Sequence, residues 1–227
     1  QTASKPLEEV WEIGPESVHP KSLEATLAAL RVHPHEITLS MALPFLPNLG
    51  QDKTLRKDKR TLSVLKTLAN AATVHACSTY LMQETEWDFM AIYHDAIDHF
   101  SHIGMRYHPP KRPEIDQKDY DDFNLVVEGA YRFHDLMLGR ILDIIEEDTT
   151  LLIVSDHGFH TDHQRPLYIP NEAAGPAVEH SPYGIFAMAG PGIKKGGQEI
   201  SGASVLDVTP TLLHYLGLAV GEDMDGK

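Results

Sequence analysis

The chain has 227 residues, of which 42% are hydrophobic, and this is enough for one sizeable core or one domain with a large insertion. Its 33 acidic and 19 basic residues give a formal net charge of -14. This balance argues against binding of the nucleic-acid backbone and disfavours an anionic membrane surface. A single cysteine excludes an intrachain disulfide framework. No apolar run reaches the roughly 18 residues of a membrane span, and no signal peptide is visible.

The first 86 residues combine irregular and helical patterns. Apolar side chains recur every three to four positions over residues 22–30 and 55–83, which predicts two helices. Prolines and a glycine between them predict a loop with a helical turn over residues 36–50. We therefore interpret residues 1–86 as a mainly helical insertion or amino-terminal segment.

Residues 87–227 alternate short apolar runs with helical patterns. The run at 87–93 predicts a buried strand, residues 120–147 predict a long helix, and the run at 151–154 predicts a second strand. A strand, a helix and a strand in this order indicate an α/β fold with a parallel sheet. A third strand is predicted over 185–189 and a closing helix over 205–216.

The first candidate ligands are Asp98 and His102, which lie four residues apart. A helical turn after Tyr93 would place both side chains on one face, where a carboxylate and an imidazole could bind one ion. Three nearby residues compete for this role: His94, Asp95 and His99.

A second motif, Asp156 and His157, directly follows the predicted strand at 151–154. Gly158 comes next and permits the turn or close backbone approach that lets both side chains reach one ion. Because ligands in parallel sheets gather at the carboxyl ends of strands, both motifs are expected at the same edge.

Three further histidines follow this second motif. His160 and His163 make the loop rich in imidazole, and they could support the ligands, contact a substrate or lie exposed. His180 stands at the entry to the third predicted strand and can supply a third ligand. Carboxylate and imidazole together suit a divalent transition ion such as zinc, and two such ions about 4 Å apart form a two-metal phosphoryl-transfer site.

These residues, in this order, resemble the alkaline phosphatase superfamily, specifically its type I phosphodiesterase/nucleotide pyrophosphatase branch. The resemblance extends over about residues 87–227. It includes Tyr93, Asp98 and His102, the run Ser155 to Phe159, His180 with Gly184 and Phe186, the run Gly190 to Ile193, the run Asp207 to Leu213, and Asp223 to Gly226.

The resemblance implies a role for each matching position. Asp98, His102 and His180 would hold one metal ion, and Asp156 and His157 would hold a second. The ions would be Zn²⁺, with Mn²⁺ as the alternative, and the substrate a small phosphoester or nucleotide. Apart from the resemblance, Tyr93, His160 and His163 are candidates that could support the ligands or contact a substrate. The implied fold is a mostly parallel sheet sandwiched by helices.

Two parts of the family's site are not found in this sequence. The family uses an Asp from the first strand of the sheet and a Thr or Ser nucleophile at a helix start. Residues 1–86 contain no apolar strand that runs into Asp-Gly, and Thr54 and Thr61 lack the nucleophile's setting. We therefore expect residues 87–227 to be the carboxyl-terminal part of the metal-binding α/β phosphoesterase domain, which is incomplete in this chain.

The favoured function is metal-dependent hydrolysis of phosphodiester or nucleotide pyrophosphate bonds through a Thr or Ser nucleophile. One alternative is a sulfatase or phosphomonoesterase of the same superfamily, although Cys77 lacks the motif that surrounds the modified cysteine of sulfatases. Another alternative is a non-catalytic metal-binding domain. The sequence leaves the compartment and the oligomeric state open.

Overall fold

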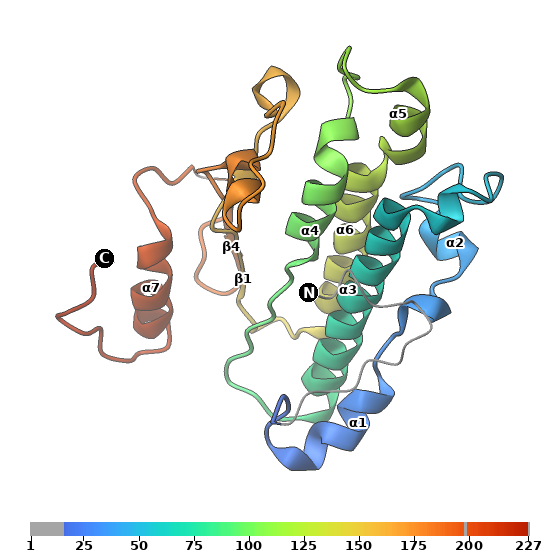
Figure 1. Cartoon of the computed structure of the whole chain (residues 1–227). Coiled ribbons are helices and arrows are strands. Elements are labelled where there is room, and N and C mark those ends of the chain that lie inside the picture. Colours follow the sequence, from blue (N-terminus) through green and yellow to red (C-terminus); the bar gives the residue numbers. More distant parts are fainter. Residues whose placement is uncertain (1–15, 198, 227) are drawn as a thin grey trace. The chain divides into compact units, whose positions relative to one another are not determined.

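The computed structural model describes residues 16–197 and 199–226, which divide into two compact units (Figure 1). The first unit contains the described residues up to Ile145 together with Phe159–His180. The second contains Glu146–Gly158 and the described residues from Ser181 onwards. Residues 1–15 of the predicted amino-terminal segment lie outside the described residues.

The first unit is built mainly from helices. They are α1 (Glu24–Ala29), α2 (Leu39–Ala42), α3 (Lys59–Glu84), α4 (Ala96–Gly104), α5 (Gln117–Phe123) and α6 (Val126–Ile144). Short 3-10 turns occur at Lys21–Leu23, Pro34–Glu36, Leu55–Lys57, Met105–Tyr107, Asp162–Gln164 and Gly175–Glu179. The helices predicted over 22–30 and 55–83 and the helical turn within 36–50 are confirmed.

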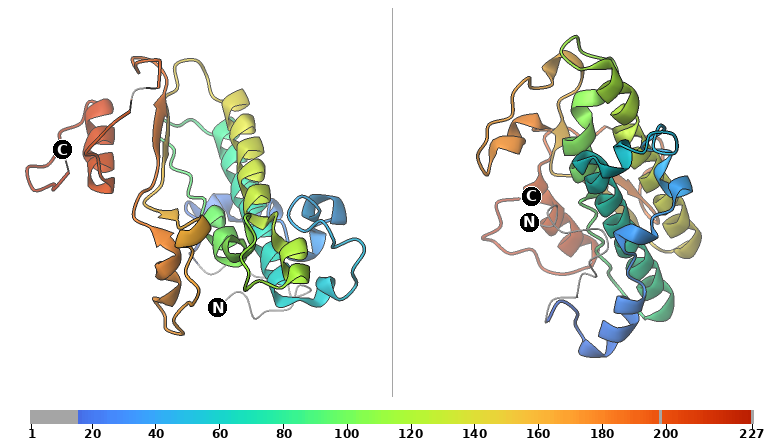
Figure 2. Two further views of the ribbon diagram at one scale, coloured as in Figure 1. Left: turned by 90° about the horizontal axis from the view of Figure 1, so that it is seen from above. Right: turned by 45° about the vertical axis from the view of Figure 1, so that its right-hand side comes forward.

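Helices α3, α4 and α6 pack side by side and enclose the core of the first unit (Figures 1 and 2). Val64, Phe100 and Val126, one from each helix, are all fully buried. The helices α4 and α6 approach closely at Gly104, where an added Cβ would lie 2.7 Å from the Cβ of Val126. This packing fixes the position of α4, the helix that carries Asp98 and His102.

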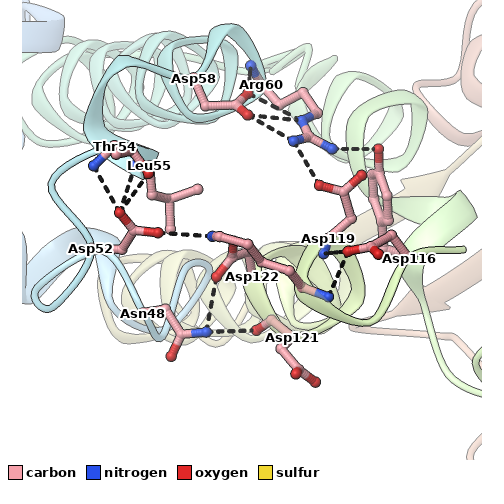
Figure 3. A network of polar contacts seen from close by, with 12 residues as sticks. Asn48, Asp52, Thr54, Leu55, Asp58, Arg60, Asp116, Asp119, Asp121 and Asp122 are labelled. Atoms are coloured by element: carbon pink, nitrogen blue, oxygen red, sulfur yellow. Dashed lines mark hydrogen bonds and ion pairs between the residues drawn. The ribbon is translucent and has the colours of Figure 1, made fainter.

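An ionic network ties the start of α3 to α5 (Figure 3). Arg60 donates to Asp119 at 2.9 Å, and its guanidinium carbon lies 4.2 Å from the centroid of a buried aromatic ring, Phe123. Lys118 lies 2.8 Å from Asp52 and 2.6 Å from Asp122. These contacts join the segment before α3 to the segment before α6, and so they complete one end of the helical core.

Arg165 anchors the segment 159–180 to the chain that follows α4. Its side chain is only 4% exposed, and it donates to the carbonyl oxygens of Met105 at 2.9 Å and Pro110 at 2.7 Å. A buried guanidinium needs such acceptors because an unpaired buried charge is costly. The segment that ends at His180 is thereby held in the first unit.

Among its described residues, the second unit has an antiparallel strand pair and a helix. Strand β1 (Leu151–Val154) pairs with β4 (Phe186–Ala189), and Leu151 lies opposite Ala189. Helix α7 (Val208–Tyr215) follows a 3-10 turn, and it ends at Gly217, whose φ of 70° suits glycine. The predicted strands at 151–154 and 185–189 and the closing helix are confirmed. Two shorter strands, β2 (Gly158–Phe159) and β3 (His180–Ser181), form a second pair.

The strand predicted over residues 87–93 is wrong, because this segment forms neither a strand nor a helix. Phe89 is 53% exposed and Tyr93 is 82% exposed, so the run is not buried either. A strand requires a neighbour for its backbone hydrogen bonds, and β1 pairs with β4 instead. The apolar run alone therefore established neither burial nor a strand partner.

The α/β class is confirmed, but the mostly parallel sheet is not. Both sheets in the described part of the chain have two strands, and β1 and β4 run antiparallel. The helix predicted over 120–147 is divided into α5 and α6 at Asn124 and Leu125. Asparagine is a weak helix former because its side chain competes for backbone hydrogen bonds. None of the described helices is both long and apolar enough to span a membrane.

Candidate metal centre

Asp98 and His102 lie one turn apart on α4. Asp98 is in the first turn of the helix and His102 in its last, and Oδ1 of Asp98 lies 3.4 Å from Nε2 of His102. Both side chains are partly buried, at 33% and 23% exposure. The helical turn that the sequence predicts after Tyr93 is therefore present, and it places a carboxylate and an imidazole on one face.

His180 joins these two residues from β3, 78 positions along the chain from His102. Its Nε2 lies 3.1 Å from Nε2 of His102 and 3.4 Å from Oδ1 of Asp98. The neighbouring backbone is held by a hydrogen bond of 2.8 Å from the amide of His160 to the carbonyl of Glu179. One carboxylate oxygen and two imidazole nitrogens therefore converge within the first unit.

This donor set fits a divalent transition ion. Around tetrahedral zinc, with bonds of about 2.0–2.1 Å, neighbouring ligand atoms lie roughly 3.3–3.4 Å apart. The three separations between the ligand atoms are 3.4, 3.4 and 3.1 Å, close to that spacing. Three protein ligands leave one position for a substrate or solvent ligand, which is typical of catalytic zinc sites.

Glu179 contacts the other ring nitrogen of His102. The carboxylate is buried, with the residue 5% exposed, and its Oε2 lies 2.8 Å from Nδ1 of His102. This hydrogen bond raises the pKa of His102, with the charge of Asp98 acting in the same direction and burial opposing both. Glu179 was not among the residues predicted from the sequence, where only its position directly before His180 sets it apart.

Phe159 packs against both imidazoles of the group. Its ring centroid lies 5.0 Å from that of His102 and 5.0 Å from that of His180, and both contacts are edge-on. Such contacts limit the rotation of the two rings. From the sequence, Phe159 was part of the motif that begins at Ser155 and had no predicted role.

Asp156 and His157 lie in the second unit, directly after β1. Nδ1 of His157 donates to the carbonyl of Gly158 at 3.1 Å, which leaves Nε2 as the nitrogen with a lone pair in the neutral ring. That Nε2 lies 3.9 Å from Oδ1 of Asp156, whose side chain is 78% exposed. Gly158 has the predicted close approach, since an added Cβ would lie 2.8 Å from the carbonyl oxygen of Tyr183.

The other candidate residues lie outside the three-ligand group. Tyr93 is 82% exposed, His163 is exposed in a 3-10 turn, and His160 is partly buried. Of the competitors near α4, Asp95 and His99 face each other, with Oδ2 of Asp95 3.6 Å from Nδ1 of His99. In the described part of the chain, the group of three or more such ligands consists of Asp98, His102 and His180.

Neither of the two threonines considered as nucleophiles has an available hydroxyl in a suitable place. Thr61 lies within α3 and is fully buried. Thr54 precedes a 3-10 turn, and its hydroxyl donates to Asp52 at 2.6 Å.

Comparison with known proteins identifies the family. The profile of the type I phosphodiesterase / nucleotide pyrophosphatase family matches residues 16–176, which is more than half of the chain. The chain belongs to this family, and the resemblance inferred from the motifs is confirmed. The match begins well before residue 87, where the motif resemblance starts, and it includes both motifs and the segment up to the turn before His180.

The chain is also similar to a curated human protein. It is 24% identical over 156 residues to "GPI ethanolamine phosphate transferase 3, catalytic subunit" from Homo sapiens. The alignment covers 69% of this chain and 12% of that protein, so the chain spans a small part of the relative's length. No solved structure matches the chain.

Proposed function

We propose that this chain supplies metal-binding residues of a two-metal phosphodiesterase or nucleotide pyrophosphatase. The observation that carries the proposal is the convergence of Asp98, His102 and His180, whose ligand atoms lie within 4.8 Å of one another. Membership of the type I phosphodiesterase family supports the same class of chemistry. The preferred ion is Zn²⁺, because a mixed carboxylate and imidazole set suits it, and Mn²⁺ is the alternative.

In this proposal each of the two groups of residues binds one ion. Asp98, His102 and His180 hold the first ion, and Asp156 and His157 contribute to the second. The neutral tautomer of His157 presents Nε2 beside Asp156, which supports a joint role for this pair. His160, His163 and Tyr93 are proposed as supporting or substrate-contacting residues, because they flank these motifs in the chain.

Divalent ions in such a site neutralise charge on the transferring phosphoryl group and act as Lewis acids. The residues of this chain orient the ligand atoms and keep part of the site away from water, since the side chains of His102 and His180 are 23% and 26% exposed. The attacking Thr or Ser is proposed to come from a segment not found in this chain. We also propose that the phosphoesterase domain has a mostly parallel sheet. A boundary near residue 87 would separate this domain from an amino-terminal helical segment.

A phosphoester-transfer reaction is the second candidate. The human relative is named as a transferase of ethanolamine phosphate, and transfer and hydrolysis differ in whether an alcohol or water accepts the phosphoryl group. The remaining alternatives are a sulfatase or phosphomonoesterase of the same superfamily and a non-catalytic metal-binding domain.

Metal analysis tests the site assignment. His180→Ala removes a nitrogen ligand, so we expect the variant to lose most of the Zn²⁺ that the wild-type chain retains after dialysis. The matched comparison is His163→Ala, which removes an exposed histidine outside the three-ligand group and should lose less zinc than His180→Ala. Element analysis by mass spectrometry provides the measurement. Equal metal loss in the two variants would contradict the assignment of His180.

A chromogenic phosphodiester assay of a zinc-loaded form of the protein that also contains the nucleophile segment then tests catalysis. Turnover that depends on Zn²⁺ supports the hydrolase, and a phosphorylated alcohol formed when glycerol is added supports transfer. Zinc retention in that longer form without turnover of phosphodiesters, phosphomonoesters or sulfate esters favours the non-catalytic domain.

A further inference from the structure

Glu179 is a buried acid in contact with a proposed ligand, although it is outside the ligand group. It is 5% exposed, and its Oε2 lies 2.8 Å from Nδ1 of His102, while Nε2 of His102 faces Asp98 and His180. The Glu179 carboxylate therefore contacts the side of the His102 ring opposite the nitrogen that faces Asp98 and His180. Burying a carboxylate destabilises the folded state unless the charge is paired, and His102 provides the partner here.

The protons on the His102 ring follow from this contact. An ionised carboxylate only accepts hydrogen bonds, so a hydrogen bond to Glu179 requires a proton on Nδ1. In the neutral ring Nε2 then carries the lone pair. That nitrogen is the one 3.4 Å from Asp98 and 3.1 Å from His180.

The backbone and one aromatic ring hold this geometry in place. The carbonyl of Glu179 accepts from the amide of His160 at 2.8 Å, which fixes residue 179 beside β2. The edge-on packing of Phe159 at 5.0 Å restrains the ring of His102 from another side. All of these residues belong to the first unit.

We propose that Glu179 is a positioning residue that holds His102 in the Nδ1–H tautomer and aims Nε2 at the metal position. The inference rests on the proposed function for its purpose, but the tautomer itself exists without metal. Carboxylates that accept from the second nitrogen of a metal-binding histidine fix its tautomer and increase its basicity, and their loss typically weakens metal binding about 10–100-fold.

Nitrogen-15 NMR of the metal-free chain tests the tautomer directly. Long-range proton–nitrogen spectra, recorded at alkaline pH where imidazoles are neutral, distinguish Nδ1–H from Nε2–H rings. We expect His102 in the wild-type chain to be Nδ1–H, and Glu179→Leu to shift it toward the Nε2–H form. Nε2–H in the wild-type chain, or the same tautomer in both proteins, would overturn the proposal.

Glu179→Gln is a conservative second variant, which keeps the test valid if Glu179→Leu does not fold. The amide oxygen of glutamine still accepts from Nδ1–H but has no charge, so we expect the wild-type tautomer with a smaller loss of zinc affinity than in Glu179→Leu. The matched control is Glu172→Gln, an exposed acid in the same segment, which should match wild type in both measurements.

Competition with a chromogenic chelator measures the zinc affinity of each variant. We expect Glu179→Leu to bind about 10–100-fold more weakly than wild type. Wild-type affinity in this variant would overturn the positioning role. If instead the wild-type chain binds no zinc but retains the Nδ1–H tautomer, the proposed function fails while the effect of Glu179 on the ring stands.

Discussion

We expect three partly buried imidazoles of the first unit, His94 among them, to make the chain sensitive to acid. Burial, aided by the neighbouring His134 and His75, lowers the pKa of His94 from 6.5 to about 4. Burial also lowers the pKa values of His134 and His75. The ring centroids of His94 and His134 lie 5.6 Å apart, so protonation of both would bring two positive charges together.

The sign of the pH dependence follows from this lowered pKa. Between pH 6.5 and about 4, the unfolded chain binds a proton at His94 that the folded chain does not, so acidification favours unfolding. We expect the wild-type chain to lose roughly 1–2 kcal/mol of unfolding free energy between about pH 7 and about pH 5 through His94, after allowance for solvent screening. Urea denaturation at the two pH values provides the measurement.

His94→Gln cannot take up this proton, so its stability should fall less than that of wild type over the same range. His163→Gln is the control, because His163 is exposed and its removal should leave the wild-type dependence unchanged. Identical pH dependence in His94→Gln and the wild-type chain would show that His94 does not contribute.

Single residues were predictable where the relevant contact is local. The spacing of Asp98 and His102 indicates one helix face, and α4 provides it. Glu179 was not predictable in this way, because its contact with His102 joins positions 77 residues apart. An acidic residue beside a histidine is common, and only the fold shows which ring it meets.

At the scale of elements, the position of α4 depends on its close packing against α6. Gly104→Ala adds a methyl group that would lie 2.7 Å from Cβ of Val126, so the two helices must move apart. We expect a loss of about 1–3 kcal/mol in unfolding free energy, measured by chemical denaturation. Weaker zinc retention should accompany it, because α4 carries Asp98 and His102.

Gly139→Ala is the matched control for this prediction. Gly139 lies in α6, and an added Cβ there would meet no atom within 4 Å. Alanine has the higher helix propensity, so this variant should be more stable by roughly 0.5–1 kcal/mol. A destabilised Gly139→Ala with an unchanged Gly104→Ala would contradict the packing argument.

Elements with a repeating local pattern were predicted well from sequence. The apolar spacing over 55–83 indicates the helix that the structure shows as α3, and Gly217 ends α7 as expected. The run at 87–93 failed because strand formation depends on a partner elsewhere in the chain. The same dependence explains why the antiparallel β1–β4 pair was not foreseen.

At the scale of the whole molecule, the two units differ in how much they bury. Val64, Phe100 and Phe123 are fully buried in the first unit. In the described part of the second unit, the buried class contains Pro210 alone, while Ile185 is 62% exposed. Buried apolar area is the main source of stability, so the second unit should open more readily.

Hydrogen exchange of individual amides measures this difference. We expect the paired residues Ile153 and Ala187, in β1 and β4, to exchange at least about 100-fold faster than Leu68 in α3. The amides of Leu68 and its neighbours in α3 provide the reference exchange rate. Equal protection in β1 and α3 would mean that the two units open together.

The separation of His102 and His180 has a thermodynamic consequence. Their facing nitrogens lie 3.1 Å apart although 78 positions separate the residues in the chain. A ligand that binds both rings at once acts as a cross-link. It excludes the more extended conformations of the unfolded chain. The binding free energy of such a ligand therefore adds to the stability of the folded state. The segment between the two histidines should become more resistant to heat as the ligand concentration rises.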